Sequence, residues 1–269
     1  MVFKVLEELT HNHNLTHLIP LSASGANQLY SGMQDNQPIV LKISDDTAIL
    51  AREAAALRAF SGYGVVKLLA YQKGVLLLER AVPGTLLESY FPQKDKTALV
   101  VACDLINRLH QAPIPHDHDF PDLKQWLTPL DQQWDIPQNY LNKARQLRDQ
   151  LLATSTAPVL LHGDLHHHNI VQHGTHWIVI DPKGIIGEPA YEIAAFIRNP
   201  LPELLALDKA ADIINDRINE FAGHLEMPKK RILDWCFVQS VLAWTWALED
   251  KWDVEHFKHL TAIFNKMDE

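Results

Sequence analysis

The sequence predicts an α+β fold of two lobes, a small antiparallel sheet followed by a larger, mostly helical region. Short apolar strands separated by turn residues precede residue 82, whereas apolar residues at helical spacing dominate from residue 94 onward. One short hairpin near residue 175 interrupts the helical part. We therefore expect residues 1–82 to form an N-terminal lobe with one helix, and residues 83–269 to form the C-terminal lobe.

Composition limits the possible classes of protein. The chain has 269 residues, 47% of them hydrophobic, so it can bury a sizeable core. The net charge of −9 argues against a nucleic-acid partner and suits a cationic small molecule, although solubility explains the charge equally well. Cys103 and Cys236 lie in apolar helical patterns, which indicates reduced thiols. With no signal peptide and no long apolar span, we expect a cytoplasmic protein without a membrane partner.

The N-terminal lobe is predicted to pair a strand with a helix. Pro38–Ile43 is an apolar strand interrupted by Lys42, and Thr47–Phe60 has the Ala and Leu content of a helix that ends at Gly62. Glu53 lies within the apolar stripe of this helix, where a carboxylate needs a partner. Lys42 is the predicted partner, although a Glu53 at the edge of the stripe would reach water instead.

Two more strands and a serine-rich turn complete this lobe. Val65–Ala70 and Val75–Arg80 are apolar runs joined by a turn, and the chain then crosses to the second lobe. The segment Leu21–Asn27 lies between two candidate strands and contains a single glycine. Its amides or the hydroxyl of Ser24 are candidates for binding a phosphate, but an ordinary serine-rich turn explains the segment equally well.

The C-terminal lobe is predicted to be built from helices around one catalytic hairpin. The predicted helices are Thr85–Phe91, Lys94–Gln111, Asp122–Leu130, Gln138–Ala153, Leu207–His224, Pro228–Glu249 and Val254–Lys266. The predicted strands are Pro158–Leu161, Ile170–Gln172 and Trp177–Ile180.

The segment between His162 and Asp181 carries the strongest functional signal. It reads HGDLHHHNIVQHGTHWIVID, with Asp164, Asn169 five residues later and Asp181 twelve beyond that. This spacing matches the H-x-D-L-x-x-x-N loop of kinases and the aspartate that follows it. Each residue alone is explained by turn capping or by the end of a strand. The joint pattern is hard to obtain by chance.

Phosphoryl transfer explains why these residue types recur at these distances. The reaction asks a protein for positioning and charge neutralisation. We expect Asp164 to accept the proton of an attacking hydroxyl, and the oxygens of Asn169 and Asp181 to bind Mg²⁺.

A nucleotide site follows from the upstream residues. Lys42, oriented by Glu53, has the position of the strand lysine that binds ATP phosphates in kinases. The backbone from Glu79 to Ala81, where the chain crosses between the lobes, is expected to bind adenine. ATP and Mg²⁺ are therefore the predicted cofactors.

Three further motifs reveal a family resemblance. DPKG lies at Asp181–Gly184, GEPAYEIA at Gly187–Ala194, and RILDWCFVQSVLAWTWALED at Arg231–Asp250. With the catalytic loop, they resemble the aminoglycoside phosphotransferase superfamily and, within it, the streptomycin 6-kinase (aminoglycoside/hydroxyurea resistance kinase) branch. The resemblance runs from about Leu21 to the end. It implies a kinase-like fold with a truncated helical lobe, and an ATP-dependent kinase whose acceptor is a hydroxyl of a small molecule, with a cationic amino sugar such as streptomycin as the expected acceptor.

The chain departs from the branch at two carboxylates and in its histidines. Glu188 and Glu192 replace the aspartates of the usual GDPAYD, and Glu192, together with His162, is expected to support the catalytic loop. His168 stands directly before Asn169, where relatives usually have a small residue, and neither the role of the run His166–His168 nor that of Lys183 follows from the family. Consecutive histidines cannot all face one ion, so a transition-metal site is not predicted.

The acceptor is expected to bind near the end of the long helix that closes the family motif. Glu249 and Asp250 are the candidates, because carboxylates bind ammonium and guanidinium groups. Trp246 and Trp252 lie beside them, but core packing explains a tryptophan here at least as well. Two other functions stay open: a housekeeping kinase of a glycated amine, choline-like or amino-alcohol acceptor, and a non-catalytic nucleotide-binding regulator.

Overall fold

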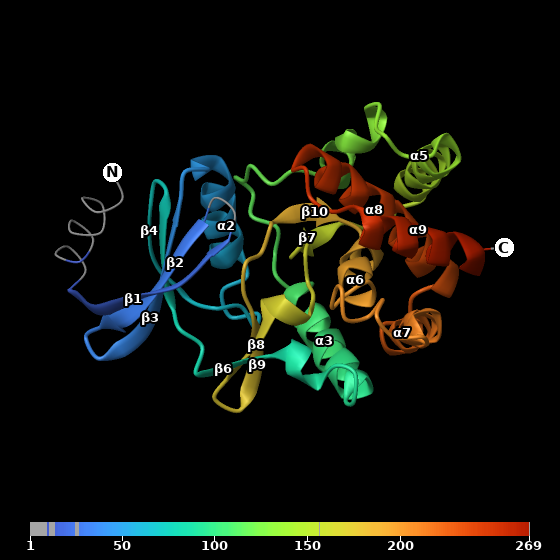
Figure 1. Ribbon diagram of the computed structural model, residues 1–269. Helices are drawn as coiled ribbons and strands as arrows, with labels where there is room; N and C mark the ends of the chain where they lie inside the picture. The colour runs from blue at the N-terminus through green and yellow to red at the C-terminus, as the bar shows by residue number, and fades with distance from the viewer. Residues whose placement is uncertain (1–9, 11–13, 25–26, 156, 269) are drawn as a thin grey trace.

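The computed structural model describes residues 10, 14–24, 27–155 and 157–268. Figure 1 shows an antiparallel sheet with one helix at the N-terminal end of the molecule and a cluster of helices at the other end. Small sheets of two and three strands lie between them. The α+β, two-lobed fold expected from the sequence is confirmed.

Five strands form the N-terminal sheet in the order β1-β2-β3-β5-β4, and each pair is antiparallel. Their bounds are β1 Leu15–Ser24, β2 Asn27–Gln34, β3 Gln37–Ser44, β4 Leu68–Gln72 and β5 Val75–Glu79. Residues 21–24, expected in a turn, belong to β1. Lys42 lies on the central strand β3, between Leu29 and Leu76. Its side chain therefore starts from a strand that is paired on both sides.

Helix α2 (Thr47–Ala59) covers this sheet. The side chain of Asp46 accepts a hydrogen bond from the amide of Ile49 and caps the helix. Leu50 and Leu57 are buried against residues of β4 and β5, in one apolar cluster with Leu76. This packing fixes the rotation of α2 and turns Glu53 toward the sheet.

The predicted helix Thr85–Phe91 is wrong. The structure has strand β6 (Pro83–Leu86) and then a short 3₁₀ turn (Leu87–Tyr90). Leu86 pairs with Val171 of the catalytic hairpin, so the hairpin recruits this segment into a sheet. Pro92 also disfavours a helical conformation at the preceding residue. Tertiary pairing here overrides a sequence of ordinary helix propensity.

The catalytic segment lies between two small sheets. Strand β7 (Val159–Leu161) pairs with β10 (Ile185–Gly187), and β8 (Ile170–His173) pairs with both β6 and β9 (His176–Val179). A 3₁₀ turn at His167–Asn169 leads into β8. The residues expected to do chemistry thus lie in the loops that connect paired strands.

Seven α-helices belong to the C-terminal lobe in the described part of the chain. They are α3 Asp95–Leu109, α4 Leu123–Trp126, α5 Gln138–Ala153, α6 Pro189–Ile197, α7 Ala210–His224, α8 Lys229–Glu249 and α9 Glu255–Met267. The predicted helix Asp122–Leu130 is split into α4 and a 3₁₀ turn, with Pro129 at the start of that turn. Helix α6 was not expected, because its short, nearly all-buried sequence lacks an amphipathic pattern.

Helix α8 is the centre of the C-terminal core. It packs against α5, α6, α7 and α9, and Trp235 on it is fully buried beside Tyr191 of α6. Across the described ranges, none of the helices has the length and apolar content needed to span a membrane.

Candidate active site

The catalytic loop is held by its own first histidine. His162 is fully buried, and its Nε2 lies 2.8 Å from the carbonyl oxygen of Ile180, while its Nδ1 accepts a hydrogen bond from the amide of Asp164. Burial lowers the pKa of His162, so the ring is neutral, with the proton on Nε2. The ring therefore joins the start of the loop to the end of β9.

Glu192 of α6 holds the same loop from the other side. Its carboxylate accepts hydrogen bonds from the amides of His162, at 2.6 Å, and Gly163, at 2.9 Å. Gly163 has a φ of +85°, and a Cβ there would lie 2.5 Å from a side-chain carbon of Ile185. The turn thus requires glycine, and the longer carboxylate of Glu192 reaches both of its amides.

Glu188, the other glutamate that replaces an aspartate of the family pattern, binds structural partners on α8. Its buried carboxylate accepts hydrogen bonds from Arg231, at 2.5 to 3.0 Å, and from the indole of Trp235. Glu188 precedes α6, and both partners lie on α8. The pair of glutamates therefore fixes α6 between the long helix and the catalytic loop.

Asp164 lies at the tip of the loop between the side chains of Arg198 and His166. Nη2 of Arg198 lies 3.7 Å from one carboxylate oxygen, and Nε2 of His166 lies 3.7 Å from the other. Burial alone would raise the pKa of Asp164, but the interaction with His166 and the charges of Lys183 and Arg198 hold it below its ordinary value. The group is therefore an ionised carboxylate.

Sequence reasoning missed Arg198. It is the residue that ends α6, and an arginine at a helix C-terminus is explained by the helix dipole alone, so the pattern carries no functional signal. In the part of the chain that the structure describes, its Nη1 is buried without a hydrogen-bond partner. A buried guanidinium nitrogen without a protein partner is a donor that water or a ligand could use.

An ion-pair chain joins the two lobes. Nζ of Lys42 lies 2.7 Å from Glu53 and 2.6 Å from Oδ1 of Asp181. Glu53 is only 4% exposed, so it pairs with Lys42 and does not reach water. Burial would lower the pKa of Lys42, but Asp181 and Glu53 raise it overall. Lys42 is thus a cation held between two carboxylates.

Oxygen atoms suited to bind a hard cation lie at the Asp181 end of these ion pairs. The amide nitrogen of Asn169 donates to the carbonyl oxygen of Asp164, at 2.8 Å, which leaves the amide oxygen as its other polar atom. Asn169 and Asp181 line the same cavity, and the amide of Ile180 donates to the carbonyl oxygen of Asn169. A carboxylate and an amide oxygen are ligands that Mg²⁺ accepts, so this donor set fits the ion.

The three consecutive histidines point to different partners. His166 faces Asp164, His167 is buried in a stack on Phe196, and His168 lies 3.1 Å from Glu88. Among the residues that the structure describes, no group of three or more His, Cys, Asp or Glu side chains is arranged to hold a metal ion.

A cavity of about 430 Å³ lies between the lobes beside Lys42. Its walls are mostly apolar, and its polar residues come from both lobes. It is lined by Leu21, Asn27, Leu29, Val40, Lys42, Glu53, Val66, Leu78, Glu79, Arg80, Ala81, Pro83, Gly84, Asn169, Val171, Ile180 and Asp181. We call it the nucleotide cavity, after the ligand that the sequence predicts there. The side chain of Ser24 lies outside the described residues.

A larger cavity of about 740 Å³ opens at Asp164, and we call it the acceptor cavity, after the ligand that the sequence predicts beside Asp164 and Asp250. Trp126, Trp246 and Trp252 line it, and the first two meet edge to face at 5.6 Å. Its charged lining residues are Arg52, Asp164, Lys183, Arg198 and Asp250. Asp250 therefore faces this cavity, whereas its neighbour Glu249 is exposed and is not one of the lining residues.

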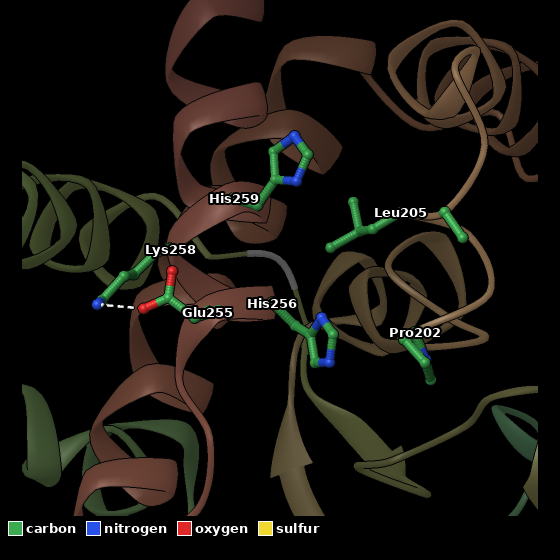
Figure 2. A pocket seen from close by; sticks show the side chains of 7 residues that line it. Pro202, Leu205, Glu255, His256, Lys258 and His259 are labelled. Carbon is green, nitrogen blue, oxygen red and sulfur yellow. Dashed lines mark hydrogen bonds and ion pairs between the residues drawn. The ribbon is translucent and has the colours of Figure 1, made fainter.

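Figure 2 shows a third hollow, between α9 and residues 202–206, that is unrelated to these residues. His256 and His259 face it, and the ion pair at its edge joins Glu255 and Lys258 within one helix turn. None of the predicted site residues lines it. The chemistry predicted from the motifs therefore lies in the two cavities between the lobes.

Comparison with known proteins identifies the family. A family model described as "Aminoglycoside/hydroxyurea antibiotic resistance kinase" matches residues 16–251. The streptomycin 3''-kinase of Klebsiella pneumoniae is 29% identical over 81% of this chain and 82% of that protein. The streptomycin 6-kinase of Streptomyces griseus is 24% identical, over 72% of this chain and 66% of the relative. The hydroxyurea phosphotransferase of Kitasatospora aureofaciens is 27% identical, over 80% and 64%.

Solved structures show the same fold at low identity. Aminoglycoside phosphotransferase APH(4)-Ia, in a ternary complex with AMP-PNP and hygromycin B, superposes with a TM-score of 0.74 at 13% identity, covering 98% of this chain and 97% of that one. A choline kinase from Streptococcus pneumoniae gives a TM-score of 0.73 at 14% identity, covering 98% and 99%. The fold is thus shared by proteins named for different acceptors.

Proposed function

The chain belongs to the family of aminoglycoside/hydroxyurea antibiotic resistance kinases, and on that premise we propose that it transfers the γ-phosphoryl group of Mg-ATP to a hydroxyl of an aminoglycoside such as streptomycin. The observation that carries the proposal is the meeting of the two cavities. Asp181 lines the one and Asp164 the other, and Asn169, which lines the first, donates to the backbone of Asp164.

The nucleotide cavity supports a role for the N-terminal lobe, residues 1–82, in binding ATP. Apolar side chains such as Val40 and Leu78 offer a slot for adenine, and the backbone at Glu79 and Ala81 lies at its edge. Lys42 would bind the phosphates, since Glu53 keeps it charged and in place. Asn169 and Asp181 would hold Mg²⁺, which neutralises phosphate charge when bound.

The C-terminal lobe, residues 83–269, would supply the catalytic carboxylate and the acceptor site. The acceptor oxygen bonds to the γ-phosphorus while the bond to the bridging oxygen of ADP breaks, and that electron pair leaves with ADP. Asp164 takes the hydroxyl proton. Because its pKa is low, it is a weak base, and its main contribution is to orient the hydroxyl until the transfer is well advanced.

Support for an amino-sugar acceptor comes from the relatives' names and from the acceptor cavity. At about 740 Å³ it has room for a molecule far larger than hydroxyurea. Asp250 offers one position for an ammonium or guanidinium group, and the tryptophan faces nearby can pack on a sugar ring or a cation. The cationic groups Arg52, Lys183 and Arg198 would oppose an acceptor with many positive charges.

The test measures ADP release from Mg-ATP by the purified protein, with streptomycin, other amino sugars and a panel of amino alcohols. Stimulation by streptomycin, absent in Asp164→Asn, is the expected result. Stimulation by an amino alcohol alone would replace the antibiotic with a metabolite acceptor. Binding of Mg-ATP without turnover on any acceptor would instead identify a nucleotide-binding regulator and overturn the proposal.

A further inference from the structure

Lys183 stands at the border between the two cavities. Its Nζ lies 2.6 Å from Oδ2 of Asp181, which lines the nucleotide cavity, while Lys183 itself lines the acceptor cavity beside Asp164. A phosphoryl group that passes from ATP to an acceptor has to cross this border. Lys183 is therefore a cation at the crossing point that the motif-based mechanism does not use.

The backbone of Lys183 is held on both sides. Its amide donates to the carbonyl oxygen of His162, at 2.7 Å, and its carbonyl oxygen accepts from Nε of Arg52, at 3.0 Å. The first bond fixes it to the catalytic loop and the second to α2 of the other lobe. Because these two hydrogen bonds fix the backbone of Lys183, the fold determines the direction in which its side chain leaves the backbone.

Both carboxylate oxygens of Asp181 have a lysine partner. Lys42 takes Oδ1 and Lys183 takes Oδ2, each at 2.6 Å. The two lysines differ, because Lys42 has a second carboxylate, Glu53, whereas Asp181 is the only ion-pair partner of Lys183 in the described part of the chain. A divalent ion that binds Asp181 through Oδ2 would claim the oxygen that Lys183 uses. Lys183 is the lysine that can be released without leaving Glu53 unpaired.

We propose that the Lys183 ammonium competes with the metal ion for Asp181 and, once displaced by the metal–nucleotide, contacts the γ-phosphoryl group and steadies it on its way to the acceptor. The inference rests on the proposed kinase function. An ammonium there would neutralise charge on the equatorial oxygens during transfer. With the metal–nucleotide bound, Lys183 would thus pair with the reacting group in place of the Asp181 carboxylate.

The test compares two ligands that differ in the γ-phosphoryl group. Binding of Mg·ADP and Mg·AMP-PNP is measured by calorimetry for the wild-type protein and Lys183→Met, without acceptor. Lys183→Met should bind Mg·ADP roughly fivefold more tightly, because the competitor is gone. Its preference for Mg·AMP-PNP over Mg·ADP should fall by about tenfold, because the charged contact is lost. Lys183→Arg should restore much of the preference.

Controls separate this role from a structural one. Lys209→Met, at an exposed lysine before α7, should match the wild type. If Lys183→Met does not fold, Lys183→Gln gives the same comparison. The inference requires both changes, so equal weakening of the two ligands, or a change in only one quantity, overturns it. If the wild-type protein binds neither ligand, the proposed kinase function fails instead.

Discussion

The two cavities of this molecule differ in how their charges are arranged. In the nucleotide cavity, the charges of Lys42, Glu53 and Asp181 form one chain of ion pairs at 2.6 to 2.7 Å. In the acceptor cavity, the contact of Arg198 with Asp164 is a loose 3.7 Å, and Nη1 of Arg198 has no hydrogen-bond partner among the described residues. A site for one invariable ligand, Mg-ATP, can be built with its charges in fixed pairs. A site for an organic acceptor keeps donors unsatisfied until the ligand arrives.

The largest expected effect separates the cavities by function. Asp164→Asn should lower kcat by about 10³-fold or more, because the carboxylate that orients the hydroxyl is lost. The Kd for Mg·ADP should change less than about twofold, since Asp164 lines the acceptor cavity. Steady-state kinetics and calorimetry check the two quantities. Full activity in this variant would remove Asp164 from the mechanism.

The second-largest effect is expected in metal-dependent nucleotide binding. Asp181→Ala removes the proposed metal ligand and the shared partner of two lysines, so we expect metal-dependent binding of ADP to weaken roughly 10- to 100-fold. Titration of ADP with and without Mg²⁺ measures this. Asp208→Ala, at an exposed carboxylate, is the control and should leave binding unchanged. An unaltered Mg²⁺ dependence in Asp181→Ala would place the metal elsewhere.

The third prediction compares two neighbouring acidic residues, Asp250 and Glu249, of which only Asp250 lines the acceptor cavity. Asp250→Asn should raise the KM for a cationic acceptor by about tenfold and leave kcat nearly constant, because a charge-assisted contact is lost. Glu249→Gln is its matched control, since this exposed side chain does not line the cavity, and its KM should stay within about twofold. Equal effects of both substitutions would indicate general electrostatic attraction in place of a contact at Asp250.

The remaining effect, on stability and not on activity, concerns the catalytic loop that serves both cavities. Burial lowers the pKa of His167 from 6.5 to about 4. Between these values the unfolded state binds more protons, so the stability that neutral His167 contributes is complete above pH 6.5 and is lost as the pH falls toward 4. His162 shifts in the same direction.

We expect this loss to amount to roughly 2 kcal/mol of unfolding free energy between pH 7 and pH 5. Urea unfolding at the two pH values should show a smaller loss for His167→Gln than for the wild type. An identical pH dependence of the two proteins would show that the pKa of His167 does not differ between the folded and unfolded states.

Some of the predictions made from the sequence succeeded and others failed, each for a physical reason. The kinase class and the family, predicted from the motifs, are confirmed by the family match and by the relatives. The Lys42–Glu53 pair followed from one charge on an apolar strand and another on an apolar helix stripe, a local anomaly that periodicity exposes. The helix predicted at Thr85–Phe91 failed because β8 pairs with that segment, which no local pattern records.

The sequence by itself determined which groups are candidates for the chemistry, because phosphoryl transfer confines its carboxylates, amide and lysine to short motifs with fixed spacing. Only the tertiary structure decided that Arg198 approaches Asp164, that Asp250 and not Glu249 faces the acceptor cavity, and that Lys183 reaches Asp181 at the border of the two cavities. These facts depend on how α6, α8 and the catalytic loop pack. Packing is set by contacts between residues far apart in the chain, and local patterns do not encode them.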